Sequence, residues 1–151
     1  EAASKALTMY LMTKGSGEDD KDRTMLSTYV PMFEELLSVN ILRPHPSTET
    51  DDAKIQKRQR TIRIRIVKQR AGMLGLCAVV NAYPYRVPAF VPGILVHIAR
   101  VVGASKGLLK TSLFSDFRKS KEDGWIHHKR KFTSEQYEFL QEYFLGGNYY
   151  A

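Results

Sequence analysis

The stretch KIQKRQRTIRIRIVKQRAGMLGLCAVVNA, residues 54–82, decides the fold. Its centre, IRIRI at residues 62–66, alternates apolar and charged side chains as a strand does. However, apolar residues in the stretch also recur at the spacing of one helix face, and no second strand is visible to pair with the first. The members of that face are Ile55, Ile62, Ile66, Met73, Leu76 and Val80. The sequence therefore predicts one long helix here.

Four small residues in the second half of this helix predict a close neighbour. Ala71, Gly72, Gly75 and Ala78 leave room for another helix to approach, although both glycines lower helix propensity. The next residues, YPYRVP at 83–88, form an extended turn, because the residue before a proline is disfavoured in a helix.

Amphipathic or apolar segments on either side predict further helices. We expect them over residues 2–12, 24–39, 107–120 and 133–145, with another that starts at Pro88 or Pro92 and ends near residue 102. Loops are expected over residues 14–22, 43–52 and 103–106. Pro31 either kinks its helix or occupies the first turn of a second one.

The last of these helices has signals at both ends. Thr133 and Gln136 have the spacing of a capping box, and Gly146 is a typical C-terminal stop. Phe132 and Tyr137 are placed as a hydrophobic staple. Paired amphipathic helices with short connections are typical of an α-solenoid, so an all-α fold is expected.

Composition limits the class of protein. The 151 residues carry a net charge of +7 and one cysteine, Cys77, in an apolar segment. A lone cysteine favours a reducing, intracellular compartment and a buried structural thiol. No membrane-spanning or signal-peptide pattern is visible. The chain starts at Glu1 rather than Met, so we expect the C-terminal piece of a larger protein.

Much of the positive charge lies in one block without acidic residues. Its members are Lys54, Lys57, Arg58, Arg60, Arg63, Arg65, Lys68 and Arg70. Such a block suits nucleic acid, an acidic protein surface or polyphosphate, and the alternative is a solvated helix face. Lys57, Arg58, Arg60, Arg63 and Arg65 are the candidate polyphosphate ligands. No nucleic-acid-binding module accompanies them, so specific nucleic-acid recognition is not expected.

Catalytic patterns are missing from the sequence. It has no Walker loop, dinucleotide-binding glycine pattern or nucleophile elbow. His127-His128 lacks a third ligand in register, so no metal site is expected. The carboxylate pairs Glu34-Glu35 and Asp19-Asp20 lack a base beside them. We therefore expect neither an enzyme nor a required cofactor. His45 and His97 are expected in a loop and on a helix face, and packing roles are expected for the aromatic residues Tyr83, Tyr85, Phe90 and Trp125.

The chain ends in Tyr149-Tyr150-Ala151, after Gly146-Gly147-Asn148. Two aromatic rings at a free terminus are explained in one of two ways. Either the tail folds back onto the last helix, or a partner binds the ring in a pocket and the terminal carboxylate through a cation or backbone amides.

Three groups of motifs, taken in order, resemble one family. They are RAGMLGLCA (70–78) with AYPYRVP (82–88) and Pro92; FSDFR (114–118) with WIHHK (125–129) and FTSEQ (132–136); and the terminal YYA (149–151). Together they resemble the C-terminal domain of the large, single-chain HEAT-repeat proteasome activators, the Blm-type family. The resemblance covers roughly residues 58 to 151.

The resemblance implies HEAT-like helical repeats that cap the α-ring of the 20S proteasome core particle without ATP. It implies a terminal hydrophobic-tyrosine-any motif that enters a pocket between α-subunits, with Tyr149 as the hydrophobic position, Tyr150 as the tyrosine and Ala151 supplying the carboxylate. It also links the family to inositol phosphate, which the basic block could bind, and to acetyl-lysine, for which the 83–90 turn is the candidate. Acetylated histones are then candidate partners.

The chain is thus expected to divide into a helical repeat region (1–52), a HEAT-like activator domain (53–145) and a flexible docking tail (146–151). A location in the nucleus and cytoplasm is expected. The alternative function is a basic helical domain that binds nucleic acid or inositol polyphosphate.

Overall fold

The computed structural model describes residues 2–13, 17–38, 52–104 and 112–145. In these ranges the chain is helical with short turns and contains no strand, which confirms the all-α prediction. The helices are α1 (Ala2–Met12), α2 (Glu18–Thr24), α3 (Val30–Leu37), α4 (Asp52–Asn81), α5 (Val91–Ala104), α6 (Leu113–Ser120), α7 (Trp125–Lys129) and α8 (Ser134–Leu145). A π-helical turn, Met25–Tyr29, precedes α3, and a 3-10 turn, Glu122–Gly124, precedes α7.

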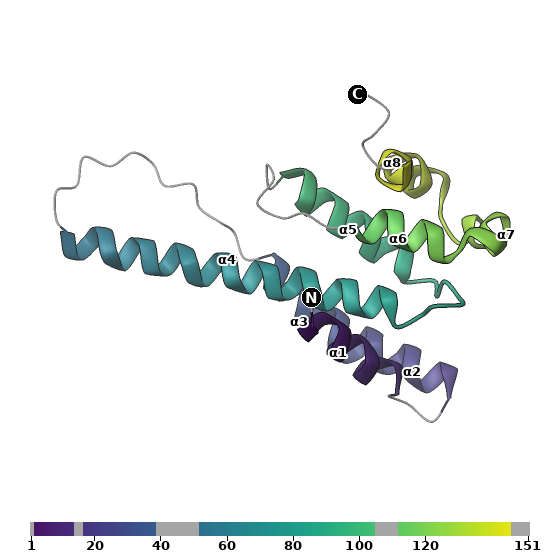
Figure 1. The fold of residues 1–151 in the computed structure, drawn as a ribbon, viewed down its shortest axis with the longest axis horizontal. Helices are drawn as coiled ribbons and strands as arrows, with labels where there is room; N and C mark the ends of the chain where they lie inside the picture. The colour runs from purple at the N-terminus through teal and green to yellow at the C-terminus, as the bar shows by residue number, and fades with distance from the viewer. Residues whose placement is uncertain (1, 14–16, 39–51, 105–111, 146–151) are drawn as a thin grey trace.

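The long helix α4 is the middle layer of the molecule (Figure 1). Helices α1 to α3 lie on one side of it and α5 to α8 on the other, while one half of α4 extends beyond both groups. The buried residues of both groups form one hydrophobic core. Within the described ranges, no helix is both long and apolar enough to cross a bilayer.

The predicted close neighbour of α4 is α3. A Cβ added at Gly72 would lie 2.6 Å from the Phe33 carbonyl oxygen and would also overlap the backbone N of Leu37. A Cβ at Gly75 would overlap the Phe33 ring. Only glycine permits this approach, and the pairing of 33 with 75 and 37 with 72 shows that α3 and α4 run antiparallel.

The two halves of α4 differ sharply. Every residue from 75 to 80 is buried, as are Gly72 and Met73. Most residues from 52 to 71 are exposed, including Ile64 at 49% and Val67 at 65%. The predicted helix over 54–82 is confirmed, because α4 covers all but the last of these residues. The thiol Cys77 is buried, as expected.

The N-terminal third departs from the prediction twice. The expected loop over 14–22 is wrong from Glu18 onward, because α2 begins there. This helix buries no side chain, so it has no apolar pattern to read, and its three N-terminal acidic residues favour the helix dipole. The expected helix over 24–39 contains a π-helical turn in which the Val30 N–H bonds to the Met25 carbonyl. Pro31 then occupies the first turn of α3, where its missing N–H is tolerated.

The connections in the C-terminal part are close to the prediction. Residues 82–90 form a non-helical turn, and α5 begins at Val91 with Pro92 in its first turn. The expected break at 103–106 starts too early, since α5 continues to Ala104. The helix expected from residue 107 is observed from Leu113, and residues 105–111 lie outside the described ranges.

Candidate functional site

Helix α8, which leads to the C-terminal tail, is held by an aromatic cluster. Phe144 contacts rings from α6, α7 and the turn after it, and its centroid lies 5.3 Å from Trp125 and 6.1 Å from Phe117. The cluster comprises Phe114, Phe117, Trp125, Phe132, Tyr137, Tyr143 and Phe144. Arg118 stacks on Trp125 at 4.4 Å, and Lys129 lies 4.2 Å from the Tyr137 ring centroid.

The N-terminus of α8 has the predicted capping box. The Gln136 N–H donates to Thr133 Oγ1 at 3.2 Å, and the Thr133 N–H donates to Gln136 Oε1 at 3.0 Å. The side chains of the expected staple, Phe132 and Tyr137, both contact Trp125. Leu140 and Phe144 are buried, so α8 is packed almost to its last residue. The candidate docking residues Tyr149, Tyr150 and Ala151 lie outside the described ranges.

Two lysines from distant elements hold the end of α4. Lys21 Nζ donates to the Ala82 carbonyl at 2.8 Å. Lys121 Nζ donates to the carbonyls of Tyr83 at 2.9 Å and Pro84 at 2.6 Å. Burial lowers the pKa of both ammonium groups. Three successive carbonyls directly after the last residue of α4, near the negative end of its dipole, thus accept hydrogen bonds from cations.

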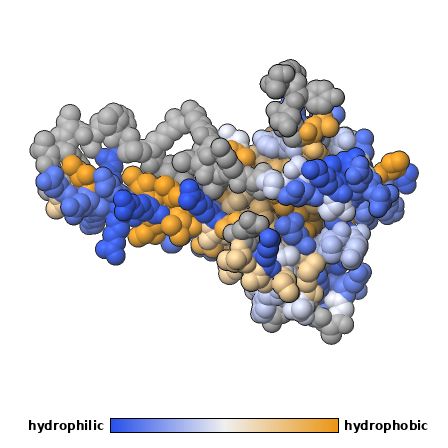
Figure 2. All heavy atoms as spheres, viewed as in Figure 1, coloured by the Kyte–Doolittle hydropathy of each residue, from blue (hydrophilic) through white to orange (hydrophobic). Residues whose placement is uncertain are grey.

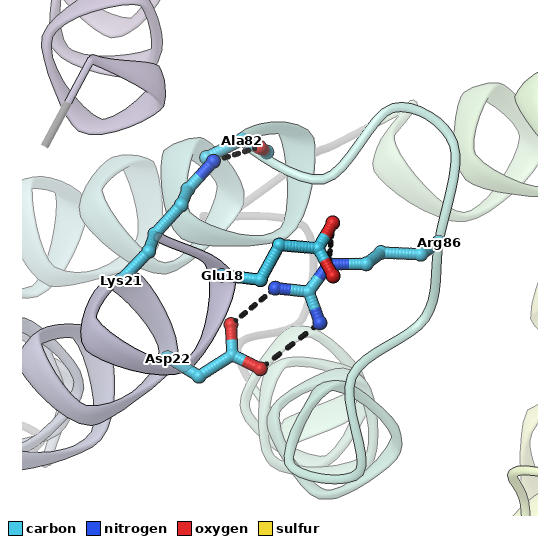
Figure 3. Close-up of polar contacts among 5 residues, drawn as sticks. All are labelled: Glu18, Lys21, Asp22, Ala82 and Arg86. Atoms are coloured by element: carbon cyan, nitrogen blue, oxygen red, sulfur yellow. Dashed lines mark hydrogen bonds and ion pairs between the residues drawn. The ribbon is translucent and has the colours of Figure 1, made fainter. Parts of the chain in front are cut away.

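An ion pair fixes the same turn to α2 (Figure 3). The Arg86 guanidinium donates to both Asp22 oxygens, at 2.6 and 3.0 Å, and Arg86 Nε lies 3.5 Å from Glu18. Arg86 and Lys21 also lie over the Tyr83 ring, at 5.0 and 4.6 Å from its centroid. The 82–90 turn is therefore bonded both to α2 on its N-terminal side in the sequence and to Lys121 on its C-terminal side.

Tyr83 is the most enclosed polar residue of this turn. Its hydroxyl is buried and has no partner at hydrogen-bonding geometry among the described residues. Burial, followed by the nearby Asp22 carboxylate, raises the pKa of Tyr83 well above its usual value. Its ring packs edge-on against Phe90 at 5.7 Å. The packing role expected for Tyr83, Phe90 and Trp125 is confirmed, but for Tyr85 it is wrong, because Tyr85 is 90% exposed.

The candidate polyphosphate ligands lie on the extended half of α4. Lys57, Arg60 and Arg63 are exposed, and Arg58 and Arg65 are half-buried. At about 100° per residue, Arg58 and Arg65, which are seven positions apart, share one side of the helix. Arg60 and Arg63 project from another side, and Lys57 stands beside Arg60, three positions before it. The helix therefore does not bring the five residues into a single cluster.

The histidines and carboxylates form no metal cluster among the residues that the structure describes. The rings of His127 and His128 lie 5.9 Å apart, and burial lowers the pKa of His128. His97 is on a helix face, as expected, and its Nδ1 lies 3.1 Å from Glu34 Oε1 on α3. Asp19 and Asp20 lie in α2 rather than in the expected loop, and His45 is outside the described ranges.

The sequence does not reveal that Lys21 and Lys121, which we call the lysine clamp, hold the end of α4. Lys121 is the buried charged residue of the described core, yet it looks like any other member of a basic, polar segment. One signal was available. The helix ends before Tyr83-Pro84 without a C-terminal glycine, so backbone carbonyls at this end need hydrogen-bond donors from elsewhere.

The chain is a small all-helical domain whose last helix is fixed on an aromatic core, with a basic helix projecting from the body. Such a domain offers surfaces for macromolecular contact.

Comparison with known proteins identifies the family. A family model described as "Proteasome activator complex subunit 4-like, C-terminal" matches residues 66–151. Proteasome activator complex subunit 4A of Danio rerio is 35% identical over 88 residues, which cover 57% of this chain and 5% of the relative. Subunit 4 of Homo sapiens is 34% identical over the same length, also 5% of the relative, and proteasome activator subunit 4 of Arabidopsis thaliana is 30% identical over 103 residues, 64% of this chain and 6% of the relative.

The chain therefore belongs to the proteasome activator complex subunit 4-like family, and its match is to the C-terminal part of that family. It spans about a twentieth of the length of the curated relatives that it matches. The match starts at residue 66, close to the point where α4 enters the packed body.

Proposed function

We propose that this chain is the C-terminal anchor of an ATP-independent activator that caps the α-ring of the 20S proteasome core particle. The observation that carries the proposal is the family match, which runs through the aromatic terminus to residue 151. The relatives are named as proteasome activator subunits. In this proposal the chain contributes binding and positioning, and it carries out no covalent chemistry.

The terminal residues Tyr149, Tyr150 and Ala151 make the contact. The Tyr150 ring enters a pocket between neighbouring α-subunits, and Tyr149 adds apolar contact beside it. A tyrosine brings a large contact area with few rotatable bonds to immobilise. The Ala151 carboxylate forms a charge-assisted contact with a cation of the pocket. Occupying the pocket shifts the α-ring population toward an open gate.

The packing of α8 supports this role. A short tail loses conformational freedom on binding, so the tail alone binds weakly. Leu140 and Phe144 fix the preceding helix, and Leu145 is its last residue. The tail therefore starts from a fixed point, and this geometry, with the larger docking surface of the activator, raises its effective concentration at the pocket.

The experiment is a pull-down of core particles by the full-length polypeptide that carries this chain. Tyr150→Ala and deletion of Ala151 are the test variants, and Gln141→Ala, an exposed change on α8, is the matched control. We expect both test variants to lose most of the binding while helicity measured by circular dichroism stays constant. Unchanged recovery of core particles by the tail variants would overturn the proposal.

A second candidate function rests on the basic half of α4. Its clustered arginines and lysines suit inositol polyphosphate, and Arg58 and Arg65 share one helix side. Binding to this side should fall with rising salt and after Arg58→Glu/Arg65→Glu. The pair Arg60→Glu/Arg63→Glu on another side is the control. Deletion of Ala151 should leave polyphosphate binding unchanged, so the two candidate functions can be separated.

The remaining expectations belong to the whole protein. HEAT-like stacking into an α-solenoid is supported by the layered helices, and the proposed sites of action are the nucleus and cytoplasm. Acetylated histones are a further proposed partner through the 83–90 turn, where the exposed Tyr85 is the available aromatic ring.

A further inference from the structure

The extended half of α4 has an apolar line that the described helices do not cover. Ile64, Val67, Ala71 and Leu74 follow one another at spacings of three and four residues, so they share one side of the helix. All four are exposed, with Ile64 at 49%, Val67 at 65% and Leu74 at 46%. Ala78, next in the same register, is fully buried where α4 enters the body. We call these four residues the α4 seam.

The α4 seam has the spacing of the core positions of a coiled coil. Ile64 and Ala71 stand at one core position of successive heptads, and Val67 and Leu74 stand at the other. The positions that flank such a seam set the choice of partner through ion pairs between the helices. Here Arg63 and Arg70 flank one edge and Lys68 flanks the other. All three are exposed, and all three are positively charged.

The seam is distinct from the apolar side that packs in the body. Ile55, Ile62, Ile66 and Met73 lie on another side of α4, which is buried at Met73. The extended half of α4 therefore has a second apolar side. Figure 2 shows apolar surface along this part of α4, interrupted by hydrophilic side chains.

The flanking charges indicate what covers the seam. A second copy of α4 would place its Arg63, Lys68 and Arg70 against the same residues of the first, and like charges at these positions disfavour pairing. The partner must offer apolar side chains to the seam and negative charge to its flanking cations. An amphipathic helix with apolar core positions and carboxylates at its flanking positions meets both requirements. Such carboxylates would pair with the three cations while the apolar side chains exclude water.

We propose that the α4 seam docks an acidic amphipathic helix of a separate protein. The two helices pack side by side, and the basic edges select a partner that carries Glu or Asp beside its apolar positions. This contact uses neither the C-terminal tail nor the α8 cluster, so it stands apart from the proteasome proposal.

The test uses the complete chain and two synthetic helical peptides. Both have Ile and Leu at the core positions; one has Glu and the other Lys at the flanking positions. We expect the Glu peptide to bind, measured by fluorescence anisotropy, and the Lys peptide to bind at least about ten-fold more weakly. Equal binding of the two peptides, or no binding of the Glu peptide, would overturn the proposal.

Two sets of variants locate the contact. Val67→Ser/Leu74→Ser should weaken binding of the Glu peptide about ten-fold or more. Arg63→Glu/Arg70→Glu should reverse the preference, so that the Lys peptide binds more tightly than the Glu peptide. Both sets change exposed residues, and circular dichroism checks that helicity is kept. Lys119→Glu, on the exposed side of α6, is the charge control. Unaltered binding in both sets, or self-association of the chain through α4 in sedimentation, would contradict the assignment.

Discussion

The two halves of α4 differ in burial, although both belong to one continuous helix. Leu76 is fully buried, whereas Leu74, two residues earlier, is 46% exposed. The C-terminal half is fixed by glycines that meet α3 and by lysines that hold its end. The N-terminal half has a comparable helical pattern but lacks such neighbours in the described structure. Periodicity therefore shows that a segment is a helix, but the contacts decide which of its apolar residues form the core.

The largest expected effect comes from the same leucine-to-alanine change made in each half of α4. Leu76→Ala should lower the free energy of unfolding by about 2–5 kcal/mol, because it leaves a cavity in the core. Leu74→Ala should change it by no more than about 0.5 kcal/mol, since the side chain is partly in water. Urea denaturation followed by circular dichroism measures both. Similar losses for the two leucines would show that the halves do not differ as described.

A second pair tests the close approach of α3. Gly72→Ala should destabilise the fold by about 1–3 kcal/mol, because the new methyl group would overlap backbone atoms of Phe33 and Leu37 that cannot rotate away. Gly93→Ala on α5 is the control. Nothing lies within 4 Å of its added Cβ, so the change should stabilise by up to about 1 kcal/mol. A neutral Gly72→Ala would contradict the packing of α3 on α4.

The next test removes the clamp at the end of the buried half. Lys121→Met should cost about 1–3 kcal/mol, because the carbonyls of Tyr83 and Pro84 lose their ammonium donor. Lys119→Met, an exposed change two residues earlier in the last turn of α6, should be nearly neutral in the same denaturation experiment. If both variants unfold at the same urea concentration as the wild type, the clamp adds nothing to stability.

The smallest expected effect is a dependence of the unfolding free energy on pH. It arises from histidine in the packed part, since residues 52–71 contain no histidine. Burial, helped by Lys121 and His127, lowers the pKa of His128. The unfolded chain therefore takes up this proton more readily, and stability should fall as the pH drops through about 6.5 and below. His128→Gln should remove part of this decline, and it should remove more of it than His127→Gln, which takes away only the contribution of His127 to the lowered pKa of His128. Parallel curves of unfolding free energy against pH for the wild type and His128→Gln would refute this role of His128.

The sequence was informative where a local rule acts. The capping box at Thr133 and Gln136, the turn before Pro84 and the close contact at Gly72 all follow from residue type and spacing. It was less informative where tertiary contacts decide. The polar helix α2 has no apolar face to detect, and the burial of Lys121 depends on carbonyls 37 and 38 residues away. Tyr85 illustrates the same limit, since it is 90% exposed although its neighbour Tyr83 is buried.

The candidate sites divide in the same way. The helical register of α4 follows from the sequence, and with it the separation of Arg58 and Arg65 from Arg60 and Arg63. Which side of α4 is covered does not follow from the sequence, because it depends on the position of α3. The docking role of the tail rests on the family, whose match includes Tyr149, Tyr150 and Ala151.

The most direct measurement is the stimulation of peptide hydrolysis when 20S core particles are mixed with the full-length protein that carries this chain. The account predicts that Tyr150→Ala abolishes most of the stimulation, while Arg60→Glu/Arg63→Glu, on the extended half of α4, leaves it unchanged. Both variants should keep wild-type helicity. Full stimulation by Tyr150→Ala, with or without an effect of the α4 variant, would contradict the assignment of the tail as the activating contact.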